Sequence, residues 1–203
     1  SLSMFISIFF SAMFYISILS FVKIWLGEKY LISNIAVLLF ASILFVKCIY
    51  SPVSTMISVV GKFKETKTAT IIAAISNVLL SILLVGKYQI SGVLFATLIS
   101  ELFITMPFYV KKIYKSVLNE NKINYYKKFV YSLLLVFGLV LIDNILINTL
   151  SLYSVPNYLN WFFSSSILGI IDAILIFVIL FFTMKSFKAL VSRFKNIIRK
   201  RNE

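Results

Sequence analysis

The chain contains no histidine and only one cysteine, Cys48, among its 203 residues. Without histidine there are no imidazole metal ligands, no histidine-based catalytic triad and no ordinary proton shuttle near neutral pH. A single cysteine cannot form a disulfide within the chain, so cysteine usage says nothing about the redox compartment. These absences argue against a conventional soluble enzyme.

Charged residues are also scarce. Asp, Glu, Lys and Arg make up 13% of the chain, whereas hydrophobic residues make up 61%. A soluble domain is about 25% charged and about 45–50% apolar, so one core could not hide this much apolar surface. Acidic residues are the rarer charge, because 7 Asp and Glu oppose 20 Lys and Arg and leave a net charge of +13. The composition predicts a membrane protein with a basic bias.

Long hydrophobic runs are what the chain has in abundance. A helix needs about 20 mostly apolar residues to cross a bilayer. Six stretches meet this requirement: residues 4–26, 31–60, 68–85, 88–110, 129–150 and 161–184. Each is a continuous run rather than a short alternating segment, which favours helices over outer-membrane strands. The predicted fold class is all-α, a polytopic bundle of six transmembrane helices, with Pro52 bending the second helix and a short turn at 86–92 pairing the third with the fourth.

The positions of the charges predict the orientation of the chain. Residues 61–67, 111–128 and 185–203 carry 16 of the 20 Lys and Arg, while the alternate connections carry Lys23, Lys29 and Lys87. Connections rich in Lys and Arg stay in the cytoplasm, so both ends of the chain are predicted to be cytoplasmic. The basic bias then reflects topology, and we expect no nucleic-acid partner.

The basic tail has a helical pattern of its own. Its apolar side chains recur at helical spacing: Phe187, Leu190, Val191, Phe194, Ile197 and Ile198. This pattern predicts an amphipathic helix lying on the anionic inner leaflet, with membrane lipids as partners. A frayed basic tail is the alternative.

Four ionisable residues lie within the predicted spans: Lys47, Glu101, Asp143 and Asp172. Each costs about 2.5–3.5 kcal/mol at the centre of a bilayer, so each needs a partner or a role. Counted from the outer ends of their helices, Glu101 lies about 18 Å deep and Lys47 about 24 Å deep. A lysine side chain can span that offset, so the two can form an ion pair if the second and fourth spans face each other. Asp143 and Asp172 could line a hydrated path or be protonated carboxyls held by neighbours. We take all four as candidates for a substrate path, with purely structural pairing as the alternative.

Signals for enzymatic chemistry are weak. The four ionisable groups lie on different helices, and the sequence has no Gly-rich phosphate loop and no Cys/His cluster. We therefore expect no catalytic residues, no metal site and no bound cofactor, and we do not expect an enzyme.

Four segments carry a family resemblance. They are residues 21–30 (FVKIWLGEKY), 51–66 (SPVSTMISVVGKFKET), 77–81 (NVLLS) and 90–100 (ISGVLFATLIS). Together they resemble the second half of a Wzx-like polysaccharide flippase of the multidrug/oligosaccharidyl-lipid/polysaccharide exporter superfamily. The resemblance spans roughly residues 20–115, and its most specific part is the loop motif Gly61, Lys62, Phe63, Lys64 and Thr66. Residues 116–203 match only in hydropathy.

The resemblance implies a transporter that flips an undecaprenyl-diphosphate-linked oligosaccharide across the bacterial plasma membrane by alternating access, for surface polysaccharide assembly. It implies that residues 1–115 are four helices of the C-terminal lobe of a MATE-like exporter fold. Residues 116–184 are then a basic cytoplasmic linker with two additional helices, and residues 185–203 are a basic amphipathic cytoplasmic tail. The chain is accordingly expected to be a fragment, with the N-terminal half of the same transporter as its partner and an H⁺ or Na⁺ gradient as a candidate energy source.

In that family, cationic groups of the cavity hold the diphosphate. Lys47 is the one cation centred in a span, and the lysines of the loop motif could meet the entering headgroup, although plain positive-inside topology explains them too. Two other functions stay open: a membrane polymerase of polysaccharide assembly, and a non-catalytic membrane scaffold. A polymerase should have a large outer loop, whereas the outer connections here are short.

Overall fold

The structure, a computed structural model, describes residues 1–61, 63–118, 121–153 and 156–202. In these ranges the chain is helical, with turns and no strand. Its α-helices are α1 (Leu2–Trp25), α2 (Asn34–Val59), α3 (Phe63–Ser100), α4 (Met106–Ile113), α5 (Ile123–Thr149), α6 (Tyr158–Thr183) and α7 (Lys185–Asn202). Three short segments join them: the 3-10 helix η1 (Glu28–Tyr30) and the π-helices η2 (Glu101–Thr105) and η3 (Tyr114–Leu118). The all-α prediction is confirmed for the described residues.

Five helical stretches in the described chain are long and apolar enough to cross a membrane: Leu2–Trp25, Asn34–Val59, Thr66–Ile113, Ile123–Thr149 and Tyr158–Thr183. Their outward-facing side chains are strongly apolar, with Leu83 76% and Phe182 73% exposed. Exposing so much apolar surface to water would be unfavourable, whereas contact with lipid chains carries no such free-energy cost. The molecule is therefore a helical bundle of the multi-pass membrane type.

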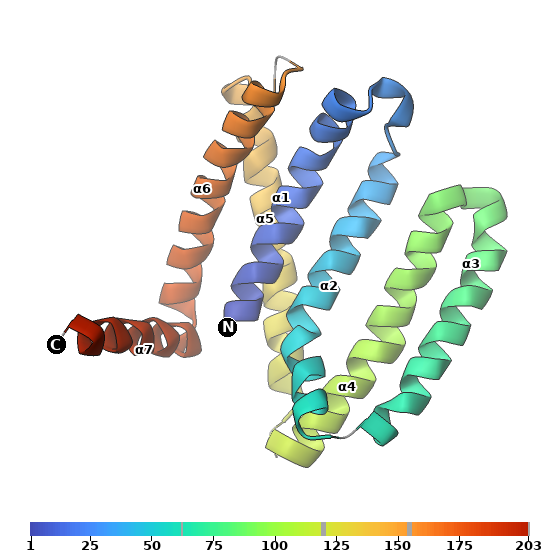
Figure 1. The fold of residues 1–203 in the computed structure, drawn as a ribbon, viewed down its shortest axis with the longest axis vertical. Helices are drawn as coiled ribbons and strands as arrows, with labels where there is room; N and C mark the ends of the chain where they lie inside the picture. Colours follow the sequence, from blue (N-terminus) through green and yellow to red (C-terminus); the bar gives the residue numbers. More distant parts are fainter. Residues whose placement is uncertain (62, 119–120, 154–155, 203) are drawn as a thin grey trace.

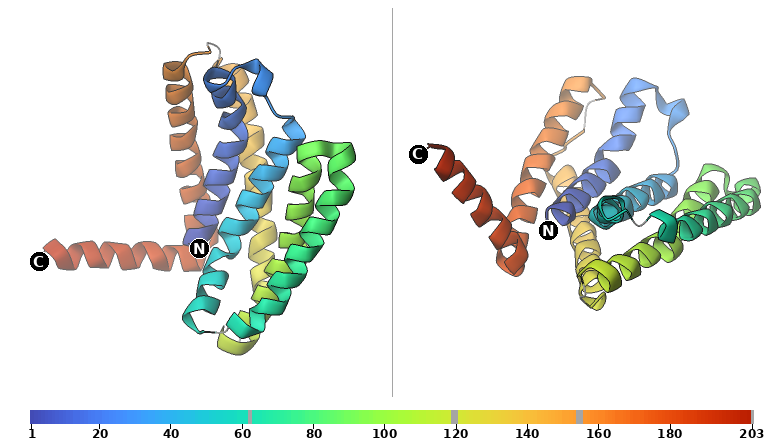
Figure 2. Two further views of the ribbon diagram at one scale, coloured as in Figure 1. Left: turned by 45° about the vertical axis from the view of Figure 1, so that its right-hand side comes forward. Right: turned by 60° about the horizontal axis from the view of Figure 1, so that its bottom comes forward.

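The third of these stretches folds back on itself. Gln89 has φ 50° and ψ −132°, a backbone conformation outside the helical range, and α3 reverses direction there. Its two arms run side by side in all the views of the molecule (Figures 1 and 2). The predicted third and fourth spans thus occur as an antiparallel pair joined by a short turn, as the sequence indicated.

Close approach of the two arms depends on Gly92. A Cβ atom at this position would lie 2.7 Å from the carbonyl oxygen of Leu84 on the first arm. That distance is well inside van der Waals contact, and the obstructing atom belongs to the backbone, which cannot rotate away. Glycine is therefore required where the second arm begins.

We expect Gly92→Ala to destabilise the hairpin by about 1–3 kcal/mol, the usual cost of overpacking. Gly86→Ala is the matched control, because a Cβ there meets nothing within 4 Å and alanine is the better helix former. Thermal unfolding of both variants in detergent micelles checks the prediction. Equal loss of stability in the two variants would contradict it.

Helix α1 lies at the centre of the bundle, where it packs against α2, α5 and α6. Its buried face carries small side chains, with Ser7, Ser11 and Ala12 no more than 1% exposed. Small residues let helix backbones approach closely where no hydrophobic effect drives association. In the C-terminal half of α1, the carbonyl oxygen of Ser17 accepts a hydrogen bond of 3.1 Å from the indole nitrogen of Trp161. This bond links α6 to α1.

The connections differ from the sequence prediction in one respect. Residues 111–128 were expected to connect the fourth and fifth spans, with a basic linker from residue 116, but the helical path continues through η3 to Leu118 and α5 begins at Ile123. The reason is that Lys and Tyr are tolerated in a helix at the edge of the apolar region, where long side chains extend toward water.

The 3-10 turn after α1 carries an exposed ion pair of 2.8 Å between Lys23 and Glu28. This ion pair lowers the pKa of Glu28.

Helix α7 turns away from the bundle and lies crosswise to its other helices, at the end where the chain starts (Figure 2). Met184, with an extended backbone, separates it from α6. Its first turn is anchored by Phe187, which is 3% exposed and lies with its ring centroid 5.6 Å from Phe177 and 6.4 Å from Phe5. This direction matches a helix lying along a membrane surface. The side chains of Phe194 and Ile198, part of the predicted apolar face, lie outside the described residues.

Candidate functional site: a polar cluster within the spans

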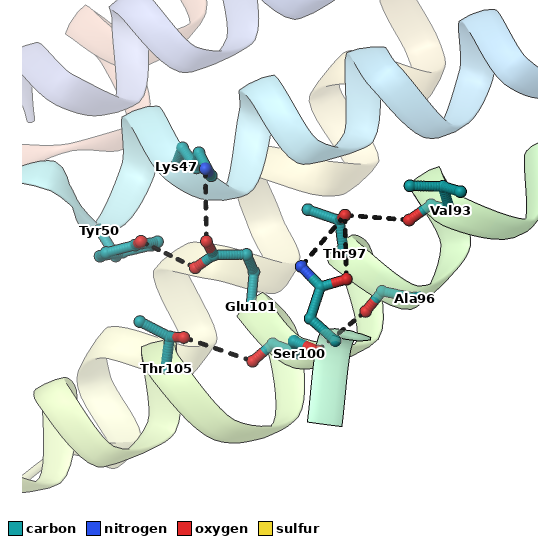
Figure 3. A network of polar contacts seen from close by, with 9 residues as sticks. Lys47, Tyr50, Val93, Ala96, Thr97, Ser100, Glu101 and Thr105 are labelled. Atoms are coloured by element: carbon teal, nitrogen blue, oxygen red, sulfur yellow. Dashed lines mark hydrogen bonds and ion pairs between the residues drawn. The ribbon is translucent and has the colours of Figure 1, made fainter. Parts of the chain in front are cut away.

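The structure joins Lys47 of α2 to Glu101 of η2 across the middle of the bundle. The Lys47 Nζ lies 3.4 Å from the Glu101 Oε1, and the Tyr50 hydroxyl donates a hydrogen bond of 2.8 Å to the Glu101 Oε2 (Figure 3). Both carboxylate oxygens are therefore occupied. The ion pair predicted from the two depths is confirmed.

The place of Glu101 follows from a local distortion of its helix. Pro107, at the start of α4, has no N–H to donate, and its ring crowds the carbonyl four residues earlier. Before this proline the chain forms the π-helix Glu101–Thr105. There the Met106 N–H donates to the carbonyl oxygen of Glu101, five residues earlier, whereas in an α-helix it would donate to that of Leu102. Such π segments often occur at functional sites, because the extra residue per turn re-aims side chains.

The cluster is part of a longer polar seam that runs from α2 into the space between the two arms of the α3 hairpin. Next to Glu101, Thr97 and Asn77 lie within 3.4 Å of each other across the two arms, and Ser81 donates to Asn77 at 3.1 Å. On the other side of the pair, the ring of Tyr50 packs edge-on against Tyr109 with centroids 6.2 Å apart. The seam gives each of these groups a partner inside a largely apolar region.

Sequence reasoning missed Tyr50 as a member of this site and did not pair Asn77 with Thr97. A usable signal existed, since Tyr50 follows Lys47 by three residues and Thr97 precedes Glu101 by four. Residues at these spacings share a helix face. What the sequence could not supply was that these two faces oppose each other.

The two partners of the ion pair differ in exposure. The Glu101 side chain is 16% exposed, whereas the Lys47 side chain is 53% exposed. Burial makes the carboxylate dependent on its partners, because an unpaired charge in an apolar environment is costly. More than half of the Lys47 side chain stays exposed, so a second anion could approach it.

Asp143 and Asp172 do not belong to this cluster. They lie on α5 and α6, both 0% exposed, and interact with each other. Two neighbouring polar residues of α5, Asn144 and Asn148, are exposed. The four candidate residues therefore form two separate pairs rather than one continuous path.

Only part of the loop motif can be placed. Gly61 adopts φ 70° at the end of α2, a conformation that favours glycine. Thr66 is buried in the first turns of α3. Lys62 lies outside the described residues, and so do the side chains of Phe63 and Lys64. Their contact with a headgroup stays a prediction.

An apolar cavity of about 530 Å³ lies beside the polar seam. The helices α1, α2 and α5 and the segment around Leu98 and Leu102 enclose it, and the two leucines flank Glu101 in the chain. Its lining is dominated by aliphatic and aromatic side chains, which suits a hydrocarbon chain. A polar pair and an apolar cavity thus share the same helices.

Comparison of the chain with protein-family models, with curated proteins and with solved structures finds no match. Within the ranges that the structure describes, His, Cys, Asp and Glu form no group of three that could hold a metal ion.

A double-mutant cycle on Lys47→Met and Glu101→Gln tests how strongly the pair stabilises the bundle. We expect a coupling energy of about 0.5–3 kcal/mol, with the double variant less destabilised than the sum of the single variants. The reason is that Lys47→Met alone leaves a buried carboxylate with only the Tyr50 hydroxyl. The measurement is unfolding in detergent micelles.

The matched control is the exposed pair Lys23–Glu28, whose side chains are 46% and 73% exposed. Solvent screening makes such exposed pairs weak. A coupling energy for Lys47 and Glu101 no larger than that of this control would show that the intramembrane pair contributes no special stability.

Proposed function

We propose that this chain is the C-terminal part of a transporter that flips a lipid-linked oligosaccharide, with undecaprenyl diphosphate as the carrier, across a bacterial plasma membrane. In this proposal the helices belong to a MATE-like exporter fold and work with the N-terminal half of the same transporter. The observation that carries the proposal is Lys47, a cation held within an apolar span with one side open.

The proposed topology has six crossings with both ends in the cytoplasm. Support comes from the reversal of α3 at Gln89, which turns one long apolar stretch into two arms. It also comes from the charges, since the connections rich in Lys and Arg alternate with connections that have few.

Labelling of single cysteines tests this topology. In a Cys48→Ala background, we expect cysteines replacing Lys29 or Lys87 to react with a membrane-impermeant maleimide added to intact cells. Cysteines replacing Lys67 or Lys111 should react only after the cells are permeabilised. All four positions are exposed, so burial would not explain a difference. Reaction at position 67 in intact cells would invert the topology.

The proposed chemistry is recognition of a diphosphate by an ammonium group that lies within an apolar span. A diphosphate headgroup cannot cross hydrocarbon with its charge unpaired. Lys47 is neutralised by Glu101 while the site is empty, and an entering anion can approach its open side and compete with the carboxylate. Tyr50 then retains Glu101 through its hydrogen bond of 2.8 Å. The apolar cavity next to the seam offers a place for part of the isoprenoid chain.

The proposed transport step is alternating access. In exporters built from two lobes, the lobes rock against each other around a site at their interface. This chain supplies one side of such a site, and the partner half supplies the other. A proton or Na⁺ gradient is the proposed source of energy.

The decisive variant is Lys47→Ala in the full-length protein. We expect it to reach the membrane but to lose transport by about tenfold or more, because a hydrogen bond to a charged group contributes about 1.5–3 kcal/mol. Lys47→Arg should retain most activity, since it keeps the charge. Surface polysaccharide in cells that carry each variant as the sole copy is the measurement, with movement of a fluorescent lipid-linked oligosaccharide in vesicles as the direct assay.

Lys67→Ala is the matched control, because Lys67 is an exposed cation at the start of α3, outside the polar seam. It should leave transport unchanged. Normal export by Lys47→Ala would remove this lysine from the site and would favour the scaffold alternative.

A further inference from the structure

Helices α5 and α6 each bury a carboxyl group inside the protein. Asp143 and Asp172 are both 0% exposed. Asp172 occupies the middle of the buried stripe of α6, whose members recur every four residues: Ser164, Leu168, Asp172, Ile176 and Leu180. On α5, Asp143 follows the buried Leu139 by one turn. The protein itself therefore encloses both groups, on the faces that its helices turn inward.

Neither carboxyl group has a hydrogen-bond donor. All four carboxylate oxygens are buried, and no described residue donates to any of them. The two groups lie close enough to interact directly. Ionised carboxylates only accept hydrogen bonds, so a bond between them requires a proton on one of the two. One hydrogen-bond donor between the two carboxyl groups would complete this site.

No lysine lies near enough along these helices to neutralise the pair. Lys128 precedes Asp143 by 15 residues on α5, which places it about 22 Å away along the axis. Lys185 follows Asp172 by 13 residues, about 20 Å along α6 into the start of α7.

Helix α1 packs against both α5 and α6 and has Tyr15 and Lys23 as titratable side chains. Gly169 meets Phe9 and Met13 of α1. Helices α1 and α6 run antiparallel, and Asp172 follows Gly169 by three residues. Asp172 therefore lies beside the first half of α1, away from Lys23 near the C-terminal end of α1.

The loop after α5 brings one further titratable group. Tyr153 interacts with Asp143, and its hydroxyl is engaged with the Ser165 Oγ at 2.9 Å. It is neutral at physiological pH and cannot balance a negative charge. Two adjacent buried carboxylates without a cation cannot both stay ionised, because burial and mutual repulsion act in the same direction.

We propose that Asp143 and Asp172 form a proton-binding site in which the two carboxyl groups share one proton at neutral pH. The proton comes from water and supplies the missing donor, so that one group donates to the other and a single negative charge is spread over the pair. No bond between heavy atoms forms or breaks. When the proton leaves at higher pH, two like charges face each other, and the contact of α5 and α6 with α1 must loosen or admit water. The site is separate from Lys47 and Glu101 and does not depend on what the protein transports.

Infrared spectroscopy of the full chain in phosphatidylcholine vesicles tests the proposal, because a protonated carboxyl has its own carbonyl band. In K⁺ buffer at neutral pH we expect such a band, and we expect it to disappear as the pH is raised. Asp143→Asn or Asp172→Asn should lower the midpoint of this titration by about one pH unit or more, because the repulsion is gone and the amide supplies a donor. The double variant should lack the band. Glu101→Gln is the control and should keep it, since Glu101 is paired with Lys47.

Three results would overturn the proposal. Absence of the band in the wild-type chain at neutral pH would show that the pair is hydrated and ionised. Loss of the band when Na⁺ replaces K⁺ at the same pH would make Na⁺ the occupant instead of a proton. A weaker band with an unchanged midpoint in each single variant would show two independent carboxyls. The first two results need no substituted protein, so they decide the matter even if a variant fails to fold.

Discussion

An unpaired polar group is very costly in hydrocarbon, and this constraint explains most of the molecule. The backbone meets it by forming helices over nearly all of the described chain. The charged side chains of Lys47 and Glu101 meet it by pairing, and the Tyr50 hydroxyl donates to the same carboxylate. Where the helix itself is interrupted at Pro107, the π-helix before it restores the hydrogen bonding and turns Glu101 toward its partners.

The same constraint organises α2 into two faces. One face carries Phe45, Val46 and Ile49 into the apolar core next to α1. The other presents Lys47 and Tyr50 to the α3 hairpin and η2. Because small residues let the helices of the bundle approach closely, the polar seam is narrow and its groups can reach one another. A polar path and a tightly packed core are thus built on one helix.

The two intramembrane pairs differ in what they need. Lys47 and Glu101 neutralise each other, and hydrogen bonds complete the carboxylate, so that pair is stable without a ligand. Asp143 and Asp172 have the same sign and no donor among the described residues. The first pair keeps an exposed lysine side chain, whereas both members of the second pair are fully buried.

The sequence by itself determined the membrane character, the helical class, the short turn within residues 86–92 and depths of Lys47 and Glu101 that a lysine side chain can bridge. These follow from local properties, namely apolar run length and a fixed rise per residue. Its resemblance to a flippase remains the source of the functional prediction. Only the tertiary structure decided that Tyr50 completes the Glu101 site, that Asp143 is buried while Asn144 is exposed, and that α7 turns away from the bundle. Those outcomes depend on which helix faces oppose each other, and that is set by packing between residues far apart in the chain.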